Sequence, residues 1–565
     1  MDRRLLLVLL VFFCQQATAQ EFKFLVRFRD KSNNGFSLSD PSSFLSAKSI
    51  LRRQRQHIPI DSTDLPVSAI YVDGLSSLPS VTVLSRSRWF NLALISVPDT
   101  SLLQGIRALS FVRSTEPVNN YYIRKIRDSV SVNQIKSASG RAFSENIRSV
   151  SGNISASDYG VAFTQIHMHQ GEYLHNQGFQ GEGMTIAILD DGFNNYLSNP
   201  AFDSLRVHNR ILGSYDFVNQ KISVNEEAHH GAWCFSIIGS DIPGSMIGTA
   251  PSASYWLFKT EDDNSESPVE EQNWVAAAEF ADSVGADLIT TSLGYGYFDD
   301  SVYDLTYSER DGHTALVSRA ANLAVAKGMI VTASAGNSGF ETDDKKFVSC
   351  PADGDSVYAV GAVDQNGRIA GFSSWGPNGS GQIKPDGVSI GSGTSFVGTD
   401  GNLYSGGGTS FSNPNLAGLI SCLWEAFPEC NPHDILAAVR VSSDQYDHPD
   451  DRYGYGVPNF EKAYQILLMK RNAGLNPLTE TDWIHVFPIP FQDRIYLFIL
   501  PSVTGTASIQ LLDVSGQLIQ TKTISVTAGQ EQLVEYLTGR PLSKGAYYIR
   551  YIDPLQTKTL KLLKN

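Results

Sequence analysis

The chain has 565 residues, of which 42% are hydrophobic, and its formal net charge is −14 at pH 7. A chain of this length can hold several domains, each with a buried core. The acidic balance argues against nucleic acid as a partner, because nucleic-acid binding needs basic patches.

Residues 1–19 have the pattern of a secretory signal peptide. Asp2 to Arg4 provide a charged start, Leu5 to Phe13 form a short apolar core, and Ala17 to Ala19 resemble a small-residue cleavage site. The alternative, a lipid attached to Cys14, is disfavoured by the bulky phenylalanines before it. The apolar run is too short to cross a bilayer, and no later run of about 20 apolar residues occurs, so we predict no transmembrane segment.

Residues 20–118 predict a small α+β domain. Residues 21–28 alternate apolar and polar side chains as a half-buried strand does, and residues 43–56 form a basic, helix-like segment. Residues 101–110 are helix-like and lie between strand-like segments at 93–97 and 112–118. Residues 119–157 are rich in Ser, Asn and Arg with little periodicity, which predicts a linker that a protease can reach.

Residues 158–470 alternate strand-like and helix-like segments, which is typical of a parallel α/β sheet. We predict strands at 185–189, 254–258, 288–291, 329–333 and 357–360, and helices at 230–238, 268–284, 314–327 and 412–426.

Four residues with reactive or polar side chains follow the predicted strands or precede the predicted helices. Asp190 ends a buried strand, at the edge where open α/β sheets bind ligands. His230 precedes a glycine and an apolar helix, and Asn337 follows a buried strand. Ser410 ends a glycine run at the start of a helix, where the helix dipole favours developing negative charge. The alternative for Ser410 is an ordinary helix N-cap.

These four segments, in the order Asp, His, Asn, Ser, resemble the subtilase (subtilisin-like, S8) serine peptidases over about residues 158–465. The resemblance implies a mostly parallel sheet flanked by helices. It also implies a secreted serine endopeptidase with Asp190, His230 and Ser410 as its triad and Asn337 as its oxyanion donor. The enzyme that the resemblance implies needs no cofactor, and its substrates are proteins or peptides. The implied walls of the substrate pocket are Ser292, Leu293, Gly294, Ala333, Ser334, Ala335 and Gly336.

The sequence departs from the family pattern at several positions near these residues. Asp191 stands where the family has Ser or Thr, Ala232 where it has Thr, and Phe411 and Ser412 stand where it has Met and Ala. None of these changes removes a reacting group, so we expect them to affect the geometry or the pKa of His230 rather than the type of reaction. The rival hypothesis is a non-catalytic surface or adhesion protein on the same scaffold, which the loss of one of the four groups would favour.

Three further features are less specific. The position of residues 20–118 before a peptidase domain resembles that of an inhibitory propeptide, and an unrelated module is the alternative. The acidic residues Asp262, Asp263 and Glu266 fit a solvated loop, a contact for basic substrate residues or a structural calcium site. Four cysteines remain after the signal peptide, and we interpret them as buried or paired structural residues whose pairing spacing does not reveal.

From about residue 479 the pattern changes to short strands separated by glycine or proline, which predicts a β-sandwich. The strands are expected at 484–491, 495–500, 507–512, 524–527 and 546–551, with a final lysine-rich strand. Residues 479–565 resemble the C-terminal sorting domain of the type IX secretion system of Bacteroidota. This implies export through the periplasm and outer membrane to the surface or medium, with the secretion machinery as partner. A generic substrate-binding β-module is the alternative.

Overall fold

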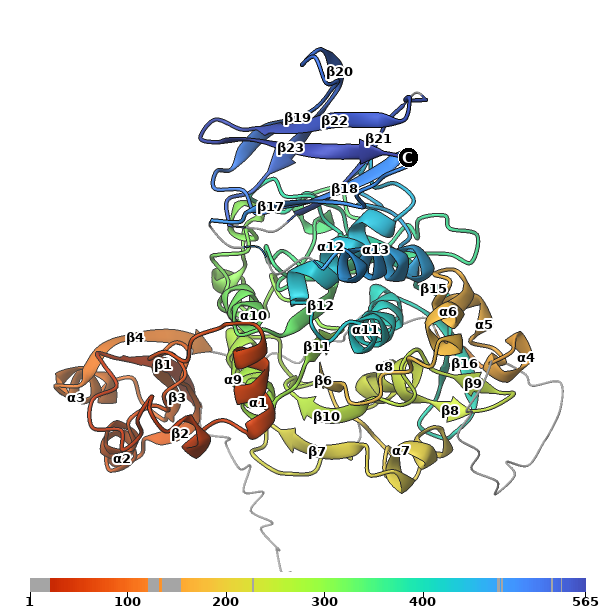
Figure 1. Cartoon of the computed structure of the whole chain (residues 1–565). Coiled ribbons are helices and arrows are strands. Elements are labelled where there is room, and N and C mark those ends of the chain that lie inside the picture. Colours follow the sequence, from red (N-terminus) through yellow and green to blue (C-terminus); the bar gives the residue numbers. More distant parts are fainter. Residues whose placement is uncertain are drawn as a thin grey trace, which may run out of the picture.

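The computed structural model describes residues 21–119, 132–134, 154–225, 228–474, 478, 481–529, 532–539 and 541–565. The predicted signal peptide, and all of the predicted linker except residues 119, 132–134 and 154–157, lie outside these residues. The described part folds into an N-terminal α+β unit, a central α/β unit and a C-terminal β unit (Figure 1). The predicted domain boundaries themselves stay a prediction.

The N-terminal unit is an antiparallel four-stranded sheet that is covered on both faces. One face packs against helices α2 and α3, and the other face contacts helix α9 of the central unit through Leu25, Leu94 and Val269. Strand β3 is therefore buried along its whole length, which explains its continuous apolar sequence. The strand order is β2 (Thr82–Ser87), β3 (Leu92–Val97), β1 (Phe22–Phe28), β4 (Val112–Asn119), and the helices are α1 (Ala47–Arg55), α2 (Ala69–Ser76) and α3 (Leu102–Ala108).

The central unit is a seven-stranded sheet in which every pair of neighbours is parallel. The predicted α/β fold is thereby confirmed. The strand order is β14 (Gly387–Ile390), β13 (Tyr358–Val363), β12 (Ile330–Ser334), β11 (Leu288–Thr291), β6 (Thr185–Asp190), β10 (Ser254–Lys259), β7 (Ile211–Asp216).

Helices cover both faces of this sheet. Side chains alternate along β6: Ile186 and Ile188 face one core, and Ala187 and Leu189 face the other. The first core is completed by α8 (His230–Gly239), α11 (Thr409–Ala426), α12 (Pro432–Ser442) and α13 (Phe460–Asn472), and the second by α9 (Pro268–Val284) and α10 (Leu316–Ala326).

Helix α11 begins three residues before its predicted start. Gly408 occupies the N-cap position, and Ser410 lies in the first turn of the helix. The interpretation of Ser410 as an ordinary N-cap is therefore wrong. The glycine run before it belongs to β16 (Leu403–Gly407), which pairs with β15 (Ser392–Val397) on one side and β5 (Val132–Gln134) on the other.

The C-terminal unit is the predicted β-sandwich. Its two sheets enclose a core that includes Ile495, Leu497, Ile509 and Ile549. One sheet has the order β17 (Ile484–Phe487), β18 (Arg494–Ile499), β21 (Gln532–Leu537), and the other β20 (Leu518–Val526), β19 (Gly505–Leu512), β22 (Gly545–Ile552), β23 (Thr557–Lys564).

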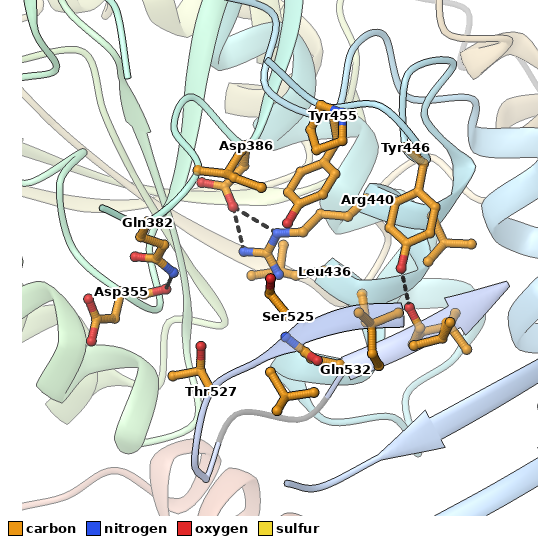
Figure 2. A pocket seen from close by; sticks show the side chains of 18 of the residues that line it. Asp355, Gln382, Asp386, Leu436, Arg440, Tyr446, Tyr455, Ser525, Thr527 and Gln532 are labelled. Carbon is orange, nitrogen blue, oxygen red and sulfur yellow. Dashed lines mark hydrogen bonds and ion pairs between the residues drawn. The ribbon is translucent and has the colours of Figure 1, made fainter. Parts of the chain in front are cut away.

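The sandwich lies on the central unit, against helices α12 and α13 (Figure 1). Tyr446 donates a hydrogen bond from its hydroxyl to the carbonyl oxygen of Leu533 at 2.6 Å. A cavity of about 850 Å³ remains between the two units, and the Arg440–Asp386 ion pair at 2.7 Å lies on its central-unit side (Figure 2).

Four cysteines lie in the described residues, and each is a free, buried thiol: Cys234, Cys350, Cys422 and Cys430. The described residues also contain no helix of the length and apolarity needed to cross a membrane.

Candidate active site

The candidate site lies at the carboxyl ends of three neighbouring strands. Strands β6, β11 and β12 are adjacent in the sheet: β6 ends at Asp190, β11 ends one residue before Ser292, and β12 ends three residues before Asn337. Helices α8 and α11 begin at the same edge and bring His230 and Ser410 to it. All four residues predicted from the sequence therefore come from elements that meet at one end of the sheet.

Asp190 and His230 form a hydrogen-bonded ion pair. His230 Nδ1 lies 2.7 Å from Asp190 Oδ1, and the carboxylate is fully buried. Because a carboxylate can only accept, Nδ1 carries the proton and Nε2 is left as the basic nitrogen. Burial alone lowers the pKa of His230, but the attraction of the Asp190 carboxylate outweighs it and raises this pKa well above its usual value.

Gly231 permits the close approach of helix α8 to strand β6. A Cβ atom at this position would lie 2.5 Å from the carbonyl oxygen of Gly192 and 2.8 Å from Cβ of Asp190. Any larger residue would push the helix and His230 away from Asp190. The glycine after the histidine is therefore required by packing as well as by the motif.

Ser410 is 6% exposed and is held by contacts of its own backbone. Its carbonyl oxygen accepts from Ser292 Oγ at 2.9 Å and from Cys234 Sγ at 3.3 Å. Its hydroxyl donates to the carbonyl oxygen of Ser292 at 3.4 Å, and no hydrogen bond to His230 is present among the described residues. Catalytic hydrogen bonds are often long or misaligned before substrate binds, so the missing bond does not by itself argue against a pairing of Ser410 with His230.

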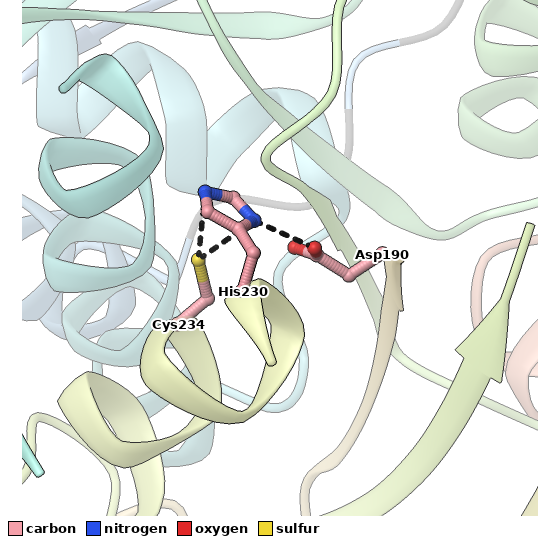
Figure 3. Close-up of side chains that lie close together, drawn as sticks. All are labelled: Asp190, His230 and Cys234. Carbon is pink, nitrogen blue, oxygen red and sulfur yellow. Dashed lines mark hydrogen bonds and ion pairs between the residues drawn. The ribbon is translucent and has the colours of Figure 1, made fainter. Parts of the chain in front are cut away.

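Cys234 is a neighbour of His230 that the sequence analysis did not single out. It lies one turn later on α8, with Sγ 3.9 Å from Nδ1 and 4.0 Å from Nε2 of His230 (Figure 3). Burial raises the pKa of this thiol, so it stays protonated. The spacing of four residues on a helix was the available signal. Asp190, His230 and Cys234 are the one group in the described part of the chain that resembles a set of metal ligands.

Asn337 is oriented by the residue before Ser410. Its Oδ1 accepts from the backbone N–H of Thr409 at 2.8 Å and from the Thr409 hydroxyl at 2.9 Å. Because its oxygen is thus occupied, the Nδ2 amide is left to donate into the pocket that Asn337 and Ser410 both line.

A pocket of about 370 Å³ opens beside Ser410. Five of the seven predicted wall residues line it: Ser292, Leu293, Gly294, Ser334 and Gly336. Ala333 and Ala335 are fully buried in the hydrophobic core instead. Side chains alternate across an extended chain, so residues 334 and 336 face the pocket while 333 and 335 point away from it.

The pocket has further lining residues that the sequence analysis missed, among them Arg310, Lys345 and Ser349. They come from segments that are distant in the sequence, and no local pattern marks them. The acidic cluster is placed differently: Glu266 lines the pocket, whereas Asp263 pairs with Lys259 at 3.7 Å. Asp262, Asp263 and Glu266 do not form a group of potential metal ligands among the described residues.

Three family models match successive parts of the chain. Residues 23–134 match the Bacteroidota propeptide domain of peptidase S8, residues 181–456 match the subtilase family, and residues 485–565 match the secretion system C-terminal sorting domain. The sorting domain indicates export to the cell surface or the medium.

Several known proteases are similar to the central part of the chain. Serine protease AprX of Bacillus subtilis is 26% identical over 345 residues, which cover 52% of this chain and 69% of AprX. Subtilisin DY of Bacillus licheniformis is 28% identical over 292 residues, 51% of this chain and 93% of that protein. The membrane-bound transcription factor site-1 protease of Mus musculus is 25% identical over 371 residues, 62% of this chain and 32% of that protein.

Proposed function

Because the chain belongs to the subtilase family of serine endopeptidases, we propose that it hydrolyses peptide bonds with Asp190, His230 and Ser410 as its catalytic triad. The observation that carries this proposal is the 2.7 Å contact between His230 Nδ1 and Asp190, next to Ser410 at the start of α11. The rival hypothesis of a non-catalytic adhesion protein has no observation in its favour, since all four groups are retained at one edge of the sheet.

In the proposed mechanism His230 acts first as a base and then as an acid. Nε2 takes the Ser410 proton as Oγ attacks the peptide carbonyl, and the buried Asp190 carboxylate stabilises the imidazolium that forms. Asn337 Nδ2 and the N-terminus of α11 face the developing oxyanion. His230 then protonates the leaving amine, and water hydrolyses the acyl-enzyme by the same route.

We further propose a role for each flanking unit. The N-terminal unit inhibits the peptidase until the chain is cut between residues 119 and 157, in keeping with the propeptide match. The C-terminal sandwich is bound by the type IX secretion machinery, in keeping with the sorting-domain match. Protein or peptide substrates meet the enzyme only after export.

The test compares two adjacent histidines and the serine. Ser410→Ala and His230→Ala should each lower kcat by about 10⁴–10⁶-fold, and the double variant should lose little more because the residues act as a unit. His229→Ala is the matched control, since His229 is exposed and packs its ring on Trp233. A fluorophosphonate probe should label the parent and the His229 variant but not Ser410→Ala. Casein cleavage by Ser410→Ala at the parent rate would exclude the mechanism.

A further inference from the structure

We propose that the pocket beside Ser410 accepts an acidic side chain, so that the enzyme cleaves after glutamate in preference to neutral or basic residues. This inference rests on the proposed function, because it concerns the substrate residue immediately before the bond that Ser410 attacks. It is carried by the charges and hydrogen-bond donors that line the pocket.

Two walls of the pocket, at Gly294 and Gly336, both approach the hydroxyl of Ser349. A Cβ atom on Gly294 would lie 2.3 Å from Ser349 Oγ, and one on Gly336 would lie 3.3 Å from it. Ser349 Oγ therefore sits between the two glycine-containing walls. It is buried and has no hydrogen-bond partner among the described residues. An unpaired donor at this place suits a substrate side chain that accepts hydrogen bonds.

A buried guanidinium forms part of the pocket lining. Arg310 is 1% exposed, and its terminal nitrogens donate to neutral groups only: the carbonyl oxygens of Phe347, Val348 and Asp344 and the hydroxyl of Tyr297. Within the described residues it has no carboxylate partner at ion-pair distance, and its Nε has no partner at all. Buried charges are normally paired, because an isolated one carries a large desolvation penalty.

A second cationic side chain, Lys345, lies near Arg310. Lys345 is exposed, lines the same pocket, and holds its Nζ 5.3 Å from the centre of the Tyr297 ring, over which Arg310 also lies at 5.3 Å. Lys345 likewise has no ion pair with a described residue. Glu266 is the single acidic residue in the lining, and it already has an interaction partner within the protein. The lining therefore carries two positive charges against one negative charge.

This arrangement discriminates between substrate side chains. A glutamate carboxylate would enter a partly dehydrated space next to two cations and an unpaired hydroxyl, where electrostatic attraction is stronger than in water. A lysine or arginine would be repelled by Arg310 and Lys345. A large apolar side chain would leave Ser349 Oγ without a partner, and sites with unpaired polar groups reject such ligands.

The experiment uses the processed enzyme, which retains the C-terminal sandwich, and a set of peptides that differ only in the residue before the scissile bond: Glu, Gln, Phe or Lys. We expect kcat/KM for Glu to exceed that for Gln by about 10-fold or more, the gain of one hydrogen bond to a charged group. Raising the salt concentration should reduce this ratio, because part of the pocket is open to solvent.

Lys345→Gln should lower the Glu to Gln ratio several-fold, and Lys345→Glu should lower it further. Lys346→Gln is the matched control: it removes the same charge one residue away, from a lysine that lies over Phe347 and Trp375 and does not line the pocket. Lys345 is exposed, so its variants should fold even if Arg310→Gln does not.

Two results would overturn the proposal: a Glu to Gln ratio of one or less in the parent, or equal effects of the Lys345 and Lys346 substitutions. Titration of Ser410 with a fluorophosphonate keeps this failure separate from failure of the proposed function. An enzyme that is labelled and cleaves after Phe refutes only the acidic preference, whereas an enzyme that is neither labelled nor active refutes the triad.

Discussion

At the scale of single residues, Asp191 links the strand that ends in Asp190 to the helix that begins with His230. Its Oδ1 accepts from the backbone N–H of Gly231 at 3.0 Å, and its carbonyl oxygen accepts from Lys259 Nζ at 2.6 Å. Burial and repulsion from Asp190 raise the pKa of Asp191 to about 7, against the attraction of His230. The proposed triad thus has a neighbouring carboxyl group, that of Asp191, which titrates near neutral pH.

This raised pKa has a consequence for stability. In the unfolded chain Asp191 has the ordinary aspartate pKa of 3.8, whereas in the folded protein it keeps its proton until about pH 7. The folded state therefore binds more protons than the unfolded state between about pH 4 and 7, and its stability falls as the pH rises through this window. Asp263 adds to the repulsion, and its own partner is Lys259.

Asp191→Asn keeps an acceptor for the Gly231 amide but removes the charge. We expect the melting temperature of this variant, relative to the parent, to rise as the pH increases from 4 to 7. We also expect the acidic limb of its kcat/KM profile to move down by roughly 0.5–1 pH unit, because His230 loses a neighbouring anion. Asp191→Ala, which also removes the acceptor, should lower kcat in addition. An unmoved acidic limb in the Asn variant would show that Asp191 does not act on His230.

The residues of the site were predictable only where a local motif marks them. Asp190, His230 and Asn337 stand next to a glycine or at the end of a buried strand, and Ser410 follows a glycine run by two residues, so the pattern of glycine and apolar residues located them. Arg310 and Ser349 reach the pocket through the tertiary fold, and nothing in their own neighbourhoods points to it. The reactive groups could therefore be predicted from the sequence, but the specificity of the pocket could not.

At the scale of elements, helix α9 illustrates what local signals determine. Ser267 and Glu270 form a capping box, Pro268 is the first helical residue, and Gly285 ends the helix in the left-handed conformation. The predicted and observed bounds agree. Helix α11 lacks such signals, since Pro414 lies well inside it, and its start was placed too late. Edge strands β7 and β14 were missed, since glycine and serine interrupt the apolar residues of both.

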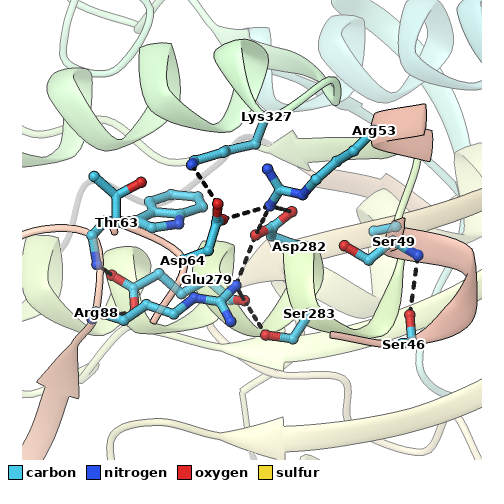
Figure 4. Close-up of polar contacts among 12 residues, drawn as sticks. Ser46, Ser49, Arg53, Thr63, Asp64, Arg88, Glu279, Asp282, Ser283 and Lys327 are labelled. Carbon is cyan, nitrogen blue, oxygen red and sulfur yellow. Dashed lines mark hydrogen bonds and ion pairs between the residues drawn. The ribbon is translucent and has the colours of Figure 1, made fainter. Parts of the chain in front are cut away.

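Helix α9 also carries the main polar contacts of the N-terminal unit. The Glu279 carboxylate accepts from Ser87 Oγ at 2.5 Å and from the backbone N–H groups of Arg88 and Trp89 at 2.8 and 3.0 Å. Asp282 is fully buried and pairs with Arg53 and Arg88 of the N-terminal unit (Figure 4). It also pairs with a third arginine of that unit, Arg52. Removal of one partner from such a buried network leaves the others uncompensated.

Asp282→Asn should therefore weaken inhibition by the N-terminal unit and leave the processed enzyme unaffected. We expect the inhibition constant of residues 21–119, added in trans, to rise by about 10²–10³-fold, since breaking a buried pair costs about 3–5 kcal/mol. The kcat/KM of the processed enzyme should not change, because Asp282 does not line the pocket. Asp203→Asn, at the surface pair with Arg206, is the control. Equal inhibition constants for Asp282→Asn and the parent would contradict the role of this cluster.

At the scale of the whole molecule, the order of the three units was predictable from changes in sequence pattern, but the contacts between them were not. Strands β18 and β21 have two apolar faces: Tyr496, Phe498 and Leu533 alternate along them with side chains of the sandwich core. The sequence shows that both faces are apolar but does not indicate what covers the second face. In the structure α12 and α13 cover it. The sandwich therefore packs on the peptidase with this second face in addition to enclosing a core of its own.

The interface between the peptidase and the sandwich is both apolar and charged. The Lys470 ammonium group is buried beside Asp434 and lies 3.8 Å from the centre of the Phe498 ring. Lys522 pairs with Asp447 at 2.6 Å, and Lys462 with Glu535 at 3.4 Å. Deleting the sandwich would expose the apolar surfaces of α12 and α13, and an exposed apolar patch of this kind favours aggregation.

Truncation after Leu478 separates stability from catalysis. No residue of the sandwich lines the pocket beside Ser410, so kcat/KM per titrated active site should stay within a few-fold of the parent. The melting temperature of the peptidase should fall by about 3 °C or more, since losing about 2 kcal/mol lowers it by roughly 4–8 °C in a domain of 150–250 residues and by less in a larger one. Phe498→Asp in the full chain should reproduce the loss of stability without removing the sorting signal, so the variant should still be exported. Ile549→Val, a mild change in the core of the sandwich, is the control for a general effect on that unit.

An unchanged melting temperature in both the truncated protein and Phe498→Asp would mean that the contact with α12 and α13 adds nothing to stability. A large loss of kcat/KM on truncation would instead assign the sandwich a part in substrate binding.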